Sequence, residues 1–401
     1  MFLPAIMLRD FGWWGYAVFA APNIIGAAAM GLIAPAGGEL AAWAAAHGRA
    51  IRWFSRVTIA FHLYFVGMLL GPILPVWSVM IGAVLVALML TVTRLFPRRA
   101  AVLAAAVWAA SAVIALAFLM TRGTPDPAPL LSRAAPLEAI PMLAVTALGF
   151  GLCPYLDATF QHARQRSGAQ APLAFVLGFA VLFAAMIAFT AVYAPLLPWL
   201  GSGAIAGGLT ATLLSGHILL QSGFTVAVHA DRVIAGETRG PTERPGGAAV
   251  GLAAGLLIGI GFLSRAIPGV AGLSFPEVGY RVFMACYGLV FPAYAWIVAL
   301  RGGFAADRPS RAEIRAFGAA VALAAPFYTV GLLWGPAWWV VPGVAIVVAG
   351  RFAVPLFHRR DACATDGGYG RDACATDGGD GRDACATSIT AGDHEPEPRS
   401  A

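Results

Sequence analysis

The sequence predicts an all-α protein that crosses a membrane many times. Of its 401 residues, 59% are hydrophobic and 11% are charged, and the mean hydropathy is +0.77. A water-soluble protein is roughly 45–50% apolar and about 25% charged, so this chain has too few polar residues to cover its core in water. Its apolar residues also form repeated blocks of about 17–25 residues, the length of a bilayer-spanning helix. Strands of a membrane barrel would instead alternate apolar and polar residues over about ten positions.

About eleven such blocks follow one another, each bounded by charged residues or by proline. They are Gly12–Ile33, Phe54–Leu74, Val76–Thr93, Ala101–Leu119, Ile140–Phe160, Leu173–Tyr193, Ile205–Val228, Ala248–Leu263, Val282–Leu300, Phe317–Leu333 and Trp338–Phe352. We therefore expect a transmembrane domain over residues 1–356, with about 10–12 helices that cross the membrane.

The arginines predict how these helices are oriented. The chain has 26 Lys+Arg residues, and every one is an arginine. One set of alternate loops holds Arg49, Arg52, Arg56, Arg94, Arg98, Arg99, Arg164, Arg166, Arg232, Arg239, Arg244, Arg301, Arg308, Arg311, Arg315, Arg351, Arg359 and Arg360. The other set holds Arg9, Arg122, Arg133 and Arg265. Because basic loops stay in the cytoplasm, we expect a multi-pass protein with a cytoplasmic C-terminus.

The arginine-only composition also narrows the class of function. Without lysine, the chain has no Walker A phosphate loop and no lysine for a Schiff base, which argues against an ATP-driven pump, a retinal protein and a Schiff-base enzyme. The net charge of +6 is spread over short loops, so we expect no nucleic-acid partner. The composition favours a bacterium with a GC-rich genome. The expected location is then the cytoplasmic (inner) membrane, with the lipid bilayer as partner.

The glycine- and alanine-rich segment Ala34–Gly48 decides how the N-terminus is oriented. We expect a loop or an interfacial helix, because Gly37, Gly38 and Glu39 suit lipid poorly. Eleven crossings then place the N-terminus outside. The alternative is a short twelfth crossing or a re-entrant piece, which would place it inside.

Residues 357–401 form a tail of a different kind. Tandem repeats read RDACATDGGYG, RDACATDGGDG and RDACATS, with no apolar face to bury. Metal sites built from cysteine need close pairs such as C-x-x-C, whereas Cys363, Cys374 and Cys385 recur once per repeat. We expect a disordered cytoplasmic tail that holds no metal.

The first block carries a candidate helix break. It contains Pro22, followed by NIIGAAAMG from Asn23 to Gly31. Proline removes a backbone donor and glycine lowers helix propensity, so the helix is expected to kink or open and expose carbonyl groups, as at sites in secondary transporters. The candidate substrate-binding residues are Asn23, Ile24, Ile25, Gly26 and Ala27. The alternative is a proline kink with a small-residue packing face from Gly26 to Gly31.

A second candidate break lies in the fifth block. Glycines and Pro154 interrupt the helix, and Tyr155 and Asp157 follow. A carboxylate at membrane depth either pairs with a cation or takes a proton, because desolvation disfavours its charged form. We expect Asp157 to couple an ion and Tyr155 to contact substrate. Alternatively, Asp157 is hydrated at the membrane surface or bonds a neighbouring helix.

The seventh block is the most polar of the series. Ser215, Ser222 and Thr225 share a helix face, so they are expected to look inward and to supply oxygen ligands for a sodium ion, with ordinary packing as the alternative. His62 and His217 form the second-choice site. Together with His229 they could be axial haem ligands between helices, although a membrane histidine more often bonds another helix or lines a polar cavity.

Glu277 and Arg281 form an i,i+4 pair at a helix entrance. A capped membrane boundary is the first interpretation of this pair. An extracellular gate is the second.

The two candidate breaks give the chain a family resemblance. The run Asn23–Gly31 resembles the glycine-rich interrupted first helix of amino acid–polyamine–organocation superfamily transporters. The stretch Phe150–Asp157, with Arg164, Arg166 and Pro172 behind it, is similar to their interrupted sixth helix and its cytoplasmic loop. The resemblance implies a leucine-transporter-like fold with two inverted five-helix repeats, a midplane site and symport driven by sodium or protons.

Two registers fit that implied fold. Either the segment Ala34–Gly48 holds a further crossing and Asp157 belongs to the sixth helix, or the first helix is an extra one, as in the sodium:solute symporter branch. In the second register, the fifth block is core helix four and the seventh block is core helix six.

These patterns predict a secondary active transporter, an ion-coupled symporter or a permease, for a small polar solute. We expect no enzymatic activity, no cofactor beyond Na⁺ or H⁺ as the coupling ion, and a small-molecule solute as partner. The alternative from another class is a membrane enzyme or a histidine-ligated haem or redox protein.

Overall fold

The structure is a computed structural model that describes residues 3–71, 77–95, 100–122, 136–194, 208–237, 247–270 and 272–365. The described chain is almost wholly helical, and 10 of its helices are long and apolar enough to cross a membrane. The shorter apolar helix Val79–Arg94 adds one more. The predicted all-α, multi-pass membrane protein is therefore confirmed.

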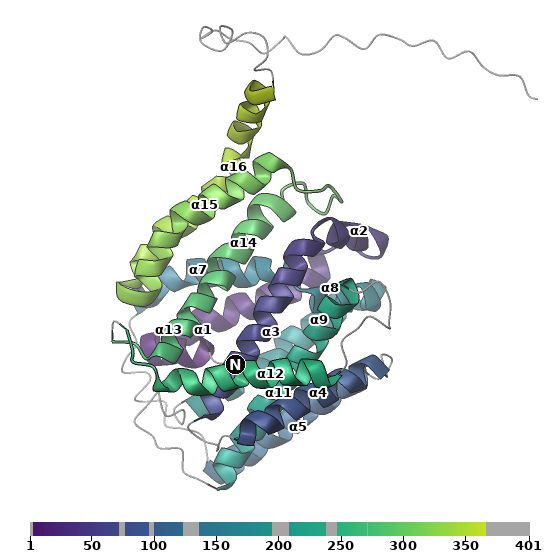
Figure 1. Cartoon of the computed structure of the whole chain (residues 1–401), viewed down its shortest axis with the longest axis vertical. Coiled ribbons are helices and arrows are strands. Elements are labelled where there is room, and N and C mark those ends of the chain that lie inside the picture. The colour runs from purple at the N-terminus through teal and green to yellow at the C-terminus, as the bar shows by residue number, and fades with distance from the viewer. Residues whose placement is uncertain are drawn as a thin grey trace, which may run out of the picture. The chain divides into compact units, whose positions relative to one another are not determined.

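The helices follow the order of the predicted blocks (Figure 1). Single helices are α1 (Leu3–Ile33), α3 (Gly48–Leu70), α4 (Trp77–Leu95), α5 (Ala100–Arg122), α7 (Pro136–Leu156), α11 (Leu209–Glu237) and α12 (Gly247–Leu263). Three longer helices are composite. The first combines α8 (Ala158–Ser167), α9 (Ala171–Val176) and α10 (Ala184–Tyr193), and the second combines α13 (Phe275–Ala285) and α14 (Phe291–Tyr294). The third is α15 (Arg311–Thr329) with the turn that follows it, and the last helix is α16 (Val340–Thr365). Their joints include π-helical turns at Leu177–Phe183, Cys286–Val290, Ala295–Ala299 and Val330–Trp334.

Residues Met1–Phe357 form one compact unit, and His358–Ala401 form a separate one. Helix α16 continues to Thr365, past residue 357, where the tail was expected to begin. The cysteine repeats beyond residue 365 lie outside the described residues.

The segment Ala34–Gly48 holds one short helix, α2 (Gly38–Ala46). Its 9 residues rise by about 14 Å, less than half of the roughly 30 Å hydrocarbon layer. It is anchored by Trp43, which is fully buried and donates its indole N–H to the carbonyl of Ala299 (2.9 Å). A twelfth crossing at this place is therefore wrong.

The break expected at Asn23–Ala27 is also wrong. Helix α1 is continuous through Pro22 and Gly31, and its non-helical residue is Gly12 (φ 61°, ψ −152°). The missing N–H of Pro22 frees the carbonyl of Val18, and the hydroxyl of Thr146 on α7 donates to it (2.8 Å). A neighbouring helix thus satisfies the group that would otherwise open α1.

The glycines after Pro22 serve close packing instead of a break. A Cβ on Gly26 would collide with the carbonyl of Phe150 on α7, and one on Gly31 would collide with Phe175 on α9. Small residues let helix backbones approach one another in a membrane, as the alternative interpretation of this run held.

The second predicted break is confirmed. Helix α7 ends at Leu156, Asp157 is extended (φ −85°, ψ 113°), and α8 begins at Ala158. Pro154 explains the position, because it cannot donate to the carbonyl of Phe150 and thereby weakens the last turn of α7.

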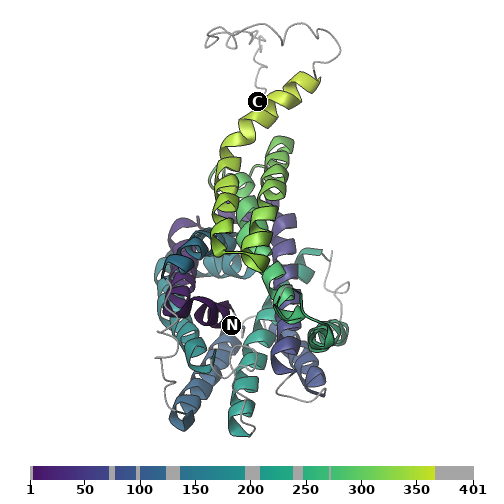
Figure 2. The ribbon, with the colours of Figure 1, turned by 90° about the vertical axis from the view of Figure 1, so that its left-hand side faces the viewer.

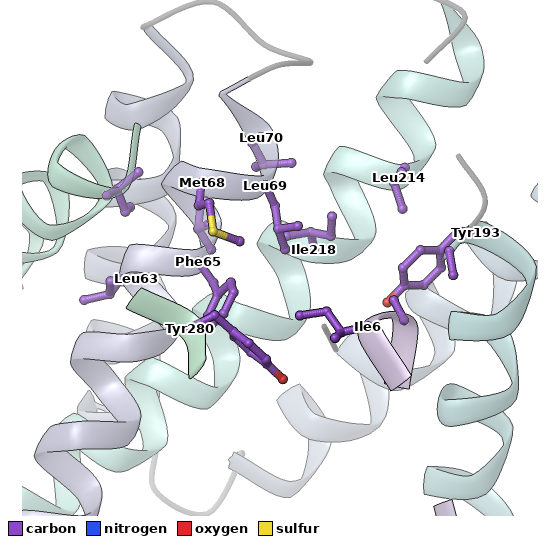
Figure 3. Close-up of a cluster of buried hydrophobic side chains, with 14 of the residues drawn as sticks. Ile6, Leu63, Phe65, Met68, Leu69, Leu70, Tyr193, Leu214, Ile218 and Tyr280 are labelled. Carbon is purple, nitrogen blue, oxygen red and sulfur yellow. The ribbon is translucent and has the colours of Figure 1, made fainter. Parts of the chain in front are cut away.

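Before Gly12, the chain enters the helix bundle as a buried segment, Leu3–Phe11. Ala5, Ile6, Met7 and Leu8 are each at most 4% exposed. Ile6 lies between Tyr193 and Tyr280 in the main apolar cluster (Figure 3), and both ribbon views place the start of α1 among the other helices (Figures 1 and 2). The positive φ at Gly12, which glycine adopts without strain, permits the turn into the bundle.

Helices α3 and α12 touch through their backbones, and this contact can be tested. A Cβ on Gly261 would collide with the carbonyl of Tyr64, whereas a Cβ on Gly259, on the same helix, would meet nothing within 4 Å. We expect Gly261→Ala to destabilise the protein by about 1–3 kcal/mol, because overpacking forces the helices apart.

The measurement is thermal unfolding in detergent, with Gly259→Ala as the matched control that leaves the melting temperature unchanged. Equal melting temperatures for the two variants would contradict the close α3–α12 contact.

Candidate functional site

A cavity of about 430 Å³ lies between the apolar helices, lined by residues of α1, α3, α7, α8, α11 and α13. This volume is within the range of about 300–1,000 Å³ found for small-molecule sites. The wall reaches from Leu3 and Pro4, in the buried start of α1, to Asp157 and His229, at the break between α7 and α8.

The structure brings six of the predicted residues to this cavity. The lining includes Asn23, Asp157, Ser222 and Thr225 of the predicted site and His62 and His217 of the second-choice site. They come from different helices, so the bundle gathers polar groups that are scattered through the sequence.

The other predicted residues do not line the cavity. They are Ile24, Ile25, Gly26, Ala27, Tyr155 and Ser215. Ile25 is 66% exposed on the outside of the bundle, and Ala27 is buried in helix packing. Tyr155 packs on Phe304, with ring centroids 5.8 Å apart. The substrate-binding role predicted for the α1 backbone depended on an open helix. Because α1 is continuous there, that prediction loses its basis.

Asp157 caps the first turn of α8. Its Oδ1 accepts hydrogen bonds from the backbone N–H of Thr159 (2.7 Å) and of Phe160 (3.4 Å), and from the Thr159 hydroxyl (2.7 Å). The first N–H groups of a helix have no partner within it, and an aspartate cap stabilises such an end by about 0.5–2 kcal/mol. The side chain is thus fixed in place while it lines the cavity.

The second oxygen of Asp157 faces a histidine. Oδ2 lies 3.7 Å from Nε2 of His229, and Nδ1 of the same ring lies 3.2 Å from Oγ of Ser55. His229 is 3% exposed and Ser55 is fully buried. A separation of 3.7 Å is longer than a hydrogen bond but short enough for strong electrostatic contact.

Further polar groups on the wall are held by their own helix or by a neighbouring one. Nδ1 of His62 donates to the carbonyl of Thr58 (2.8 Å), which leaves Nε2 free. The hydroxyl of Thr58 also contacts the hydroxyl of Tyr287. On α11, Gln221 donates to Ser111 Oγ (2.9 Å).

His217 differs from these groups. It is 4% exposed, packs against the rings of Phe189 and Tyr193, and its Nδ1 has no hydrogen-bond partner within the described part of the chain.

Aromatic residues form the largest class in the cavity wall. They are Phe19, Phe54, Phe61, Phe65, Phe150, Phe160, Phe179, Phe183, Phe224, Tyr280, Phe283 and Tyr287. Asp157 is the one carboxylate among the described lining residues, and no arginine is among them. Across the described residues, no group of three or more His, Cys, Asp and Glu side chains is arranged to hold a metal ion.

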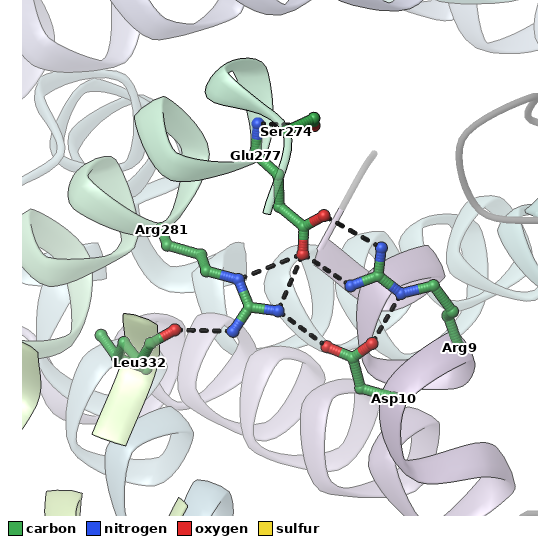
Figure 4. Close-up of polar contacts among 6 residues, drawn as sticks. All are labelled: Arg9, Asp10, Ser274, Glu277, Arg281 and Leu332. Carbon is green, nitrogen blue, oxygen red and sulfur yellow. Dashed lines mark hydrogen bonds and ion pairs between the residues drawn. The ribbon is translucent and has the colours of Figure 1, made fainter. Parts of the chain in front are cut away.

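A network of four charged side chains joins α1 to α13 (Figure 4). Glu277 accepts from both Arg9 (2.6 and 3.1 Å) and Arg281 (2.8 and 3.1 Å), and Asp10 bridges the same two guanidinium groups (2.6 and 3.1 Å). Arg281 also donates to the carbonyl of Leu332 (2.6 Å). We call Arg9, Asp10, Glu277 and Arg281 the charge cluster.

The charge cluster lies where the start of α1 meets the first turns of α13. Its side chains are 8–24% exposed. It tethers Leu3–Phe11, whose first residues, Leu3 and Pro4, line the cavity.

Sequence reasoning found Glu277 and Arg281 but missed their partners. Arg9 and Asp10 are 268 and 271 positions away from the residues that they bond, and no local spacing reports such a pair. The pattern of charges is the signal that could have found them. Arg9 and Asp10, adjacent and opposite in charge, precede the first apolar block, and Glu277 and Arg281 precede the ninth.

Comparison of the chain with protein-family models, with curated proteins and with solved structures finds no match.

The charge cluster predicts a measurable coupling between α1 and α13. Glu277→Gln leaves two arginines facing one carboxylate, so it should lower the free energy of unfolding. The double variant Arg9→Gln/Glu277→Gln should lose less than the sum of the single changes, with a coupling energy of about 0.5–3 kcal/mol.

The measurement is a double-mutant cycle of chemical or thermal unfolding. Glu138→Gln, at an exposed carboxylate in the first turn of α7, is the control and should show no coupling to Arg9→Gln. Strict additivity of the Arg9 and Glu277 changes would contradict the tether.

Proposed function

We propose that the protein is a secondary active transporter that carries a small solute, chemically unchanged, through the cavity by alternating access. One observation supports the proposal: a solute-sized cavity between apolar helices, beside a helix break, with polar groups from several helices in an aromatic wall. Broken helices beside a midplane cavity are the architecture on which secondary transporters rely.

The two ends of the cavity suit such a cycle. At one end, Leu3–Phe11 is held by the charge cluster, and at the other the α7–α8 break is held by the Asp157 cap. Alternating access would require that these polar contacts exchange their protein partners for water in turn.

The arrangement around Asp157 favours a proton as the coupling ion. A sodium site needs several oxygen ligands together, and of the three hydroxyl residues predicted to supply them Ser215 lies away from the cavity. A carboxylate facing an imidazole is instead a common proton-binding pair.

The proposed location is the inner membrane of a bacterium, with the C-terminus in the cytoplasm, as the arginine distribution predicts. The resemblance to amino acid–polyamine–organocation transporters adds little support, because α1 is continuous where that resemblance required a break.

A haem or redox protein is the second candidate. The observation that favours it is that His62, His217 and His229 line the same cavity, with Nε2 of His62 free. An absorption spectrum of the purified protein separates the two proposals, because two-histidine haem gives a strong Soret band and a carrier gives none.

Alternating access predicts that the cavity is reached by water from both membrane faces. In a variant without native cysteines, we expect Ser222→Cys to react with a charged, membrane-impermeant thiol reagent added to either face of proteoliposomes. Ile25→Cys, at a position 66% exposed on the lipid side, is the control and should not react from either face, because a thiolate does not form in lipid.

Reaction of Ser222→Cys from one face alone would contradict a carrier and favour a one-sided pocket.

A further inference from the structure

The described side chains that line the cavity include a negative charge but no fixed positive charge. Asp157 is the one carboxylate among its described lining residues, and no arginine lines it. The N–H groups at the start of α8 stabilise the charge of Asp157 in part, and a positive charge nearby would stabilise it further. The chemistry of the wall therefore favours a cation over an anionic solute.

The two oxygens of Asp157 are not equivalent. The cap donors of α8 occupy Oδ1, whereas Oδ2 has no hydrogen bond among the described residues and faces Nε2 of His229 at 3.7 Å. The tautomer of His229 decides what lies between Nε2 and Oδ2. Nε2 points its N–H toward the carboxylate when Nδ1 accepts from Ser55, and a further proton or a cation occupies the gap when Nδ1 donates. The pair can therefore hold one exchangeable positive charge.

Three described side chains interact electrostatically with this pair. His62 on α3 interacts with both Asp157 and His229, and Cys153 on α7 and Tyr287 after α13 interact with Asp157. None of these three side chains carries a fixed positive charge.

The rest of the wall suits an organic cation better than a metal ion. Aromatic faces attract ammonium groups, with about 0.5–2 kcal/mol for each well-placed ring, and they cover an apolar body at the same time. His217 also lines the cavity, and its imidazole adds a polar ring to this aromatic wall.

We propose that the cavity binds an organic cation, an ammonium group on an aromatic or alkyl body, and that this cation replaces the proton held between Asp157 and His229. The inference rests on the proposed transport function and makes it an exchange of a proton for an amine. The ammonium takes the place beside Oδ2, the body lies among the phenylalanines, and the released proton goes to water.

Three ligands with one aromatic body test the charge requirement: tryptamine, neutral tryptophol and anionic indole-3-propionate. Binding to the detergent-purified full chain is measured by titration calorimetry. We expect tryptamine to bind at least about tenfold more tightly than tryptophol, and indole-3-propionate not to bind. Equal binding of tryptamine and tryptophol, or binding by none of the three, overturns the proposal.

Proton exchange is tested by the same titration between about pH 6 and 9, where the ammonium of tryptamine stays charged. Competition with a proton should raise the affinity for tryptamine by up to about tenfold per pH unit while the pair is protonated, and leave the affinity for tryptophol constant. A tryptamine affinity that does not change with pH overturns the exchange.

Asp157→Asn removes the charge but keeps a residue that caps helices well, so the variant should fold. It should lose the preference for tryptamine over tryptophol, whereas Glu138→Gln, the same type of change outside the cavity, should keep it. An Asp157→Asn variant that melts like the wild type and retains the preference overturns the proposal.

The outcome is separable from that of the transport proposal. A cation preference with Ser222→Cys reacting from one face alone would reject transport and keep the binding site. Reaction from both faces without a cation preference would keep transport and reject the amine.

Discussion

The fold and the candidate site both depend on a carboxylate in an apolar bundle. Pro154 ends α7, and the unpaired N–H groups at the start of α8 must then find an acceptor away from water. Asp157 supplies it with one oxygen and turns the other to His229. The same side chain therefore stabilises the helix break, lines the cavity and brings the charge that a ligand or a proton must balance.

Four charged side chains, the charge cluster, hold another part of the bundle together. Arg9, Asp10, Glu277 and Arg281 neutralise one another and hold the segment before Gly12 inside the bundle. The cavity lies between a tethered helix segment and a capped helix break. Polar contacts hold both the helix segment and the helix break, so each can move when those contacts are exchanged for water.

The sequence predicted the membrane class, the order of the helices and the break at Asp157, because block length, arginine distribution and proline act locally. It failed at Asn23, since the missing donor of Pro22 is compensated by Thr146 on another helix, a contact that no local pattern reports. It missed Arg9 and Asp10 for the same reason. Helix periodicity grouped Ser215 with Ser222 and Thr225, but the cavity ends before Ser215.

The most direct measurement is the melting temperature of wild type and Asp157→Asn at one ionic strength in sodium chloride, in potassium chloride and with added tryptamine hydrochloride. A ligand that binds the folded state alone raises stability by mass action. Our account predicts a rise with tryptamine in the wild type, none in Asp157→Asn, and no difference between sodium and potassium. A sodium-specific rise that is lost in Asp157→Asn would contradict it and assign the charge of Asp157 to an inorganic ion.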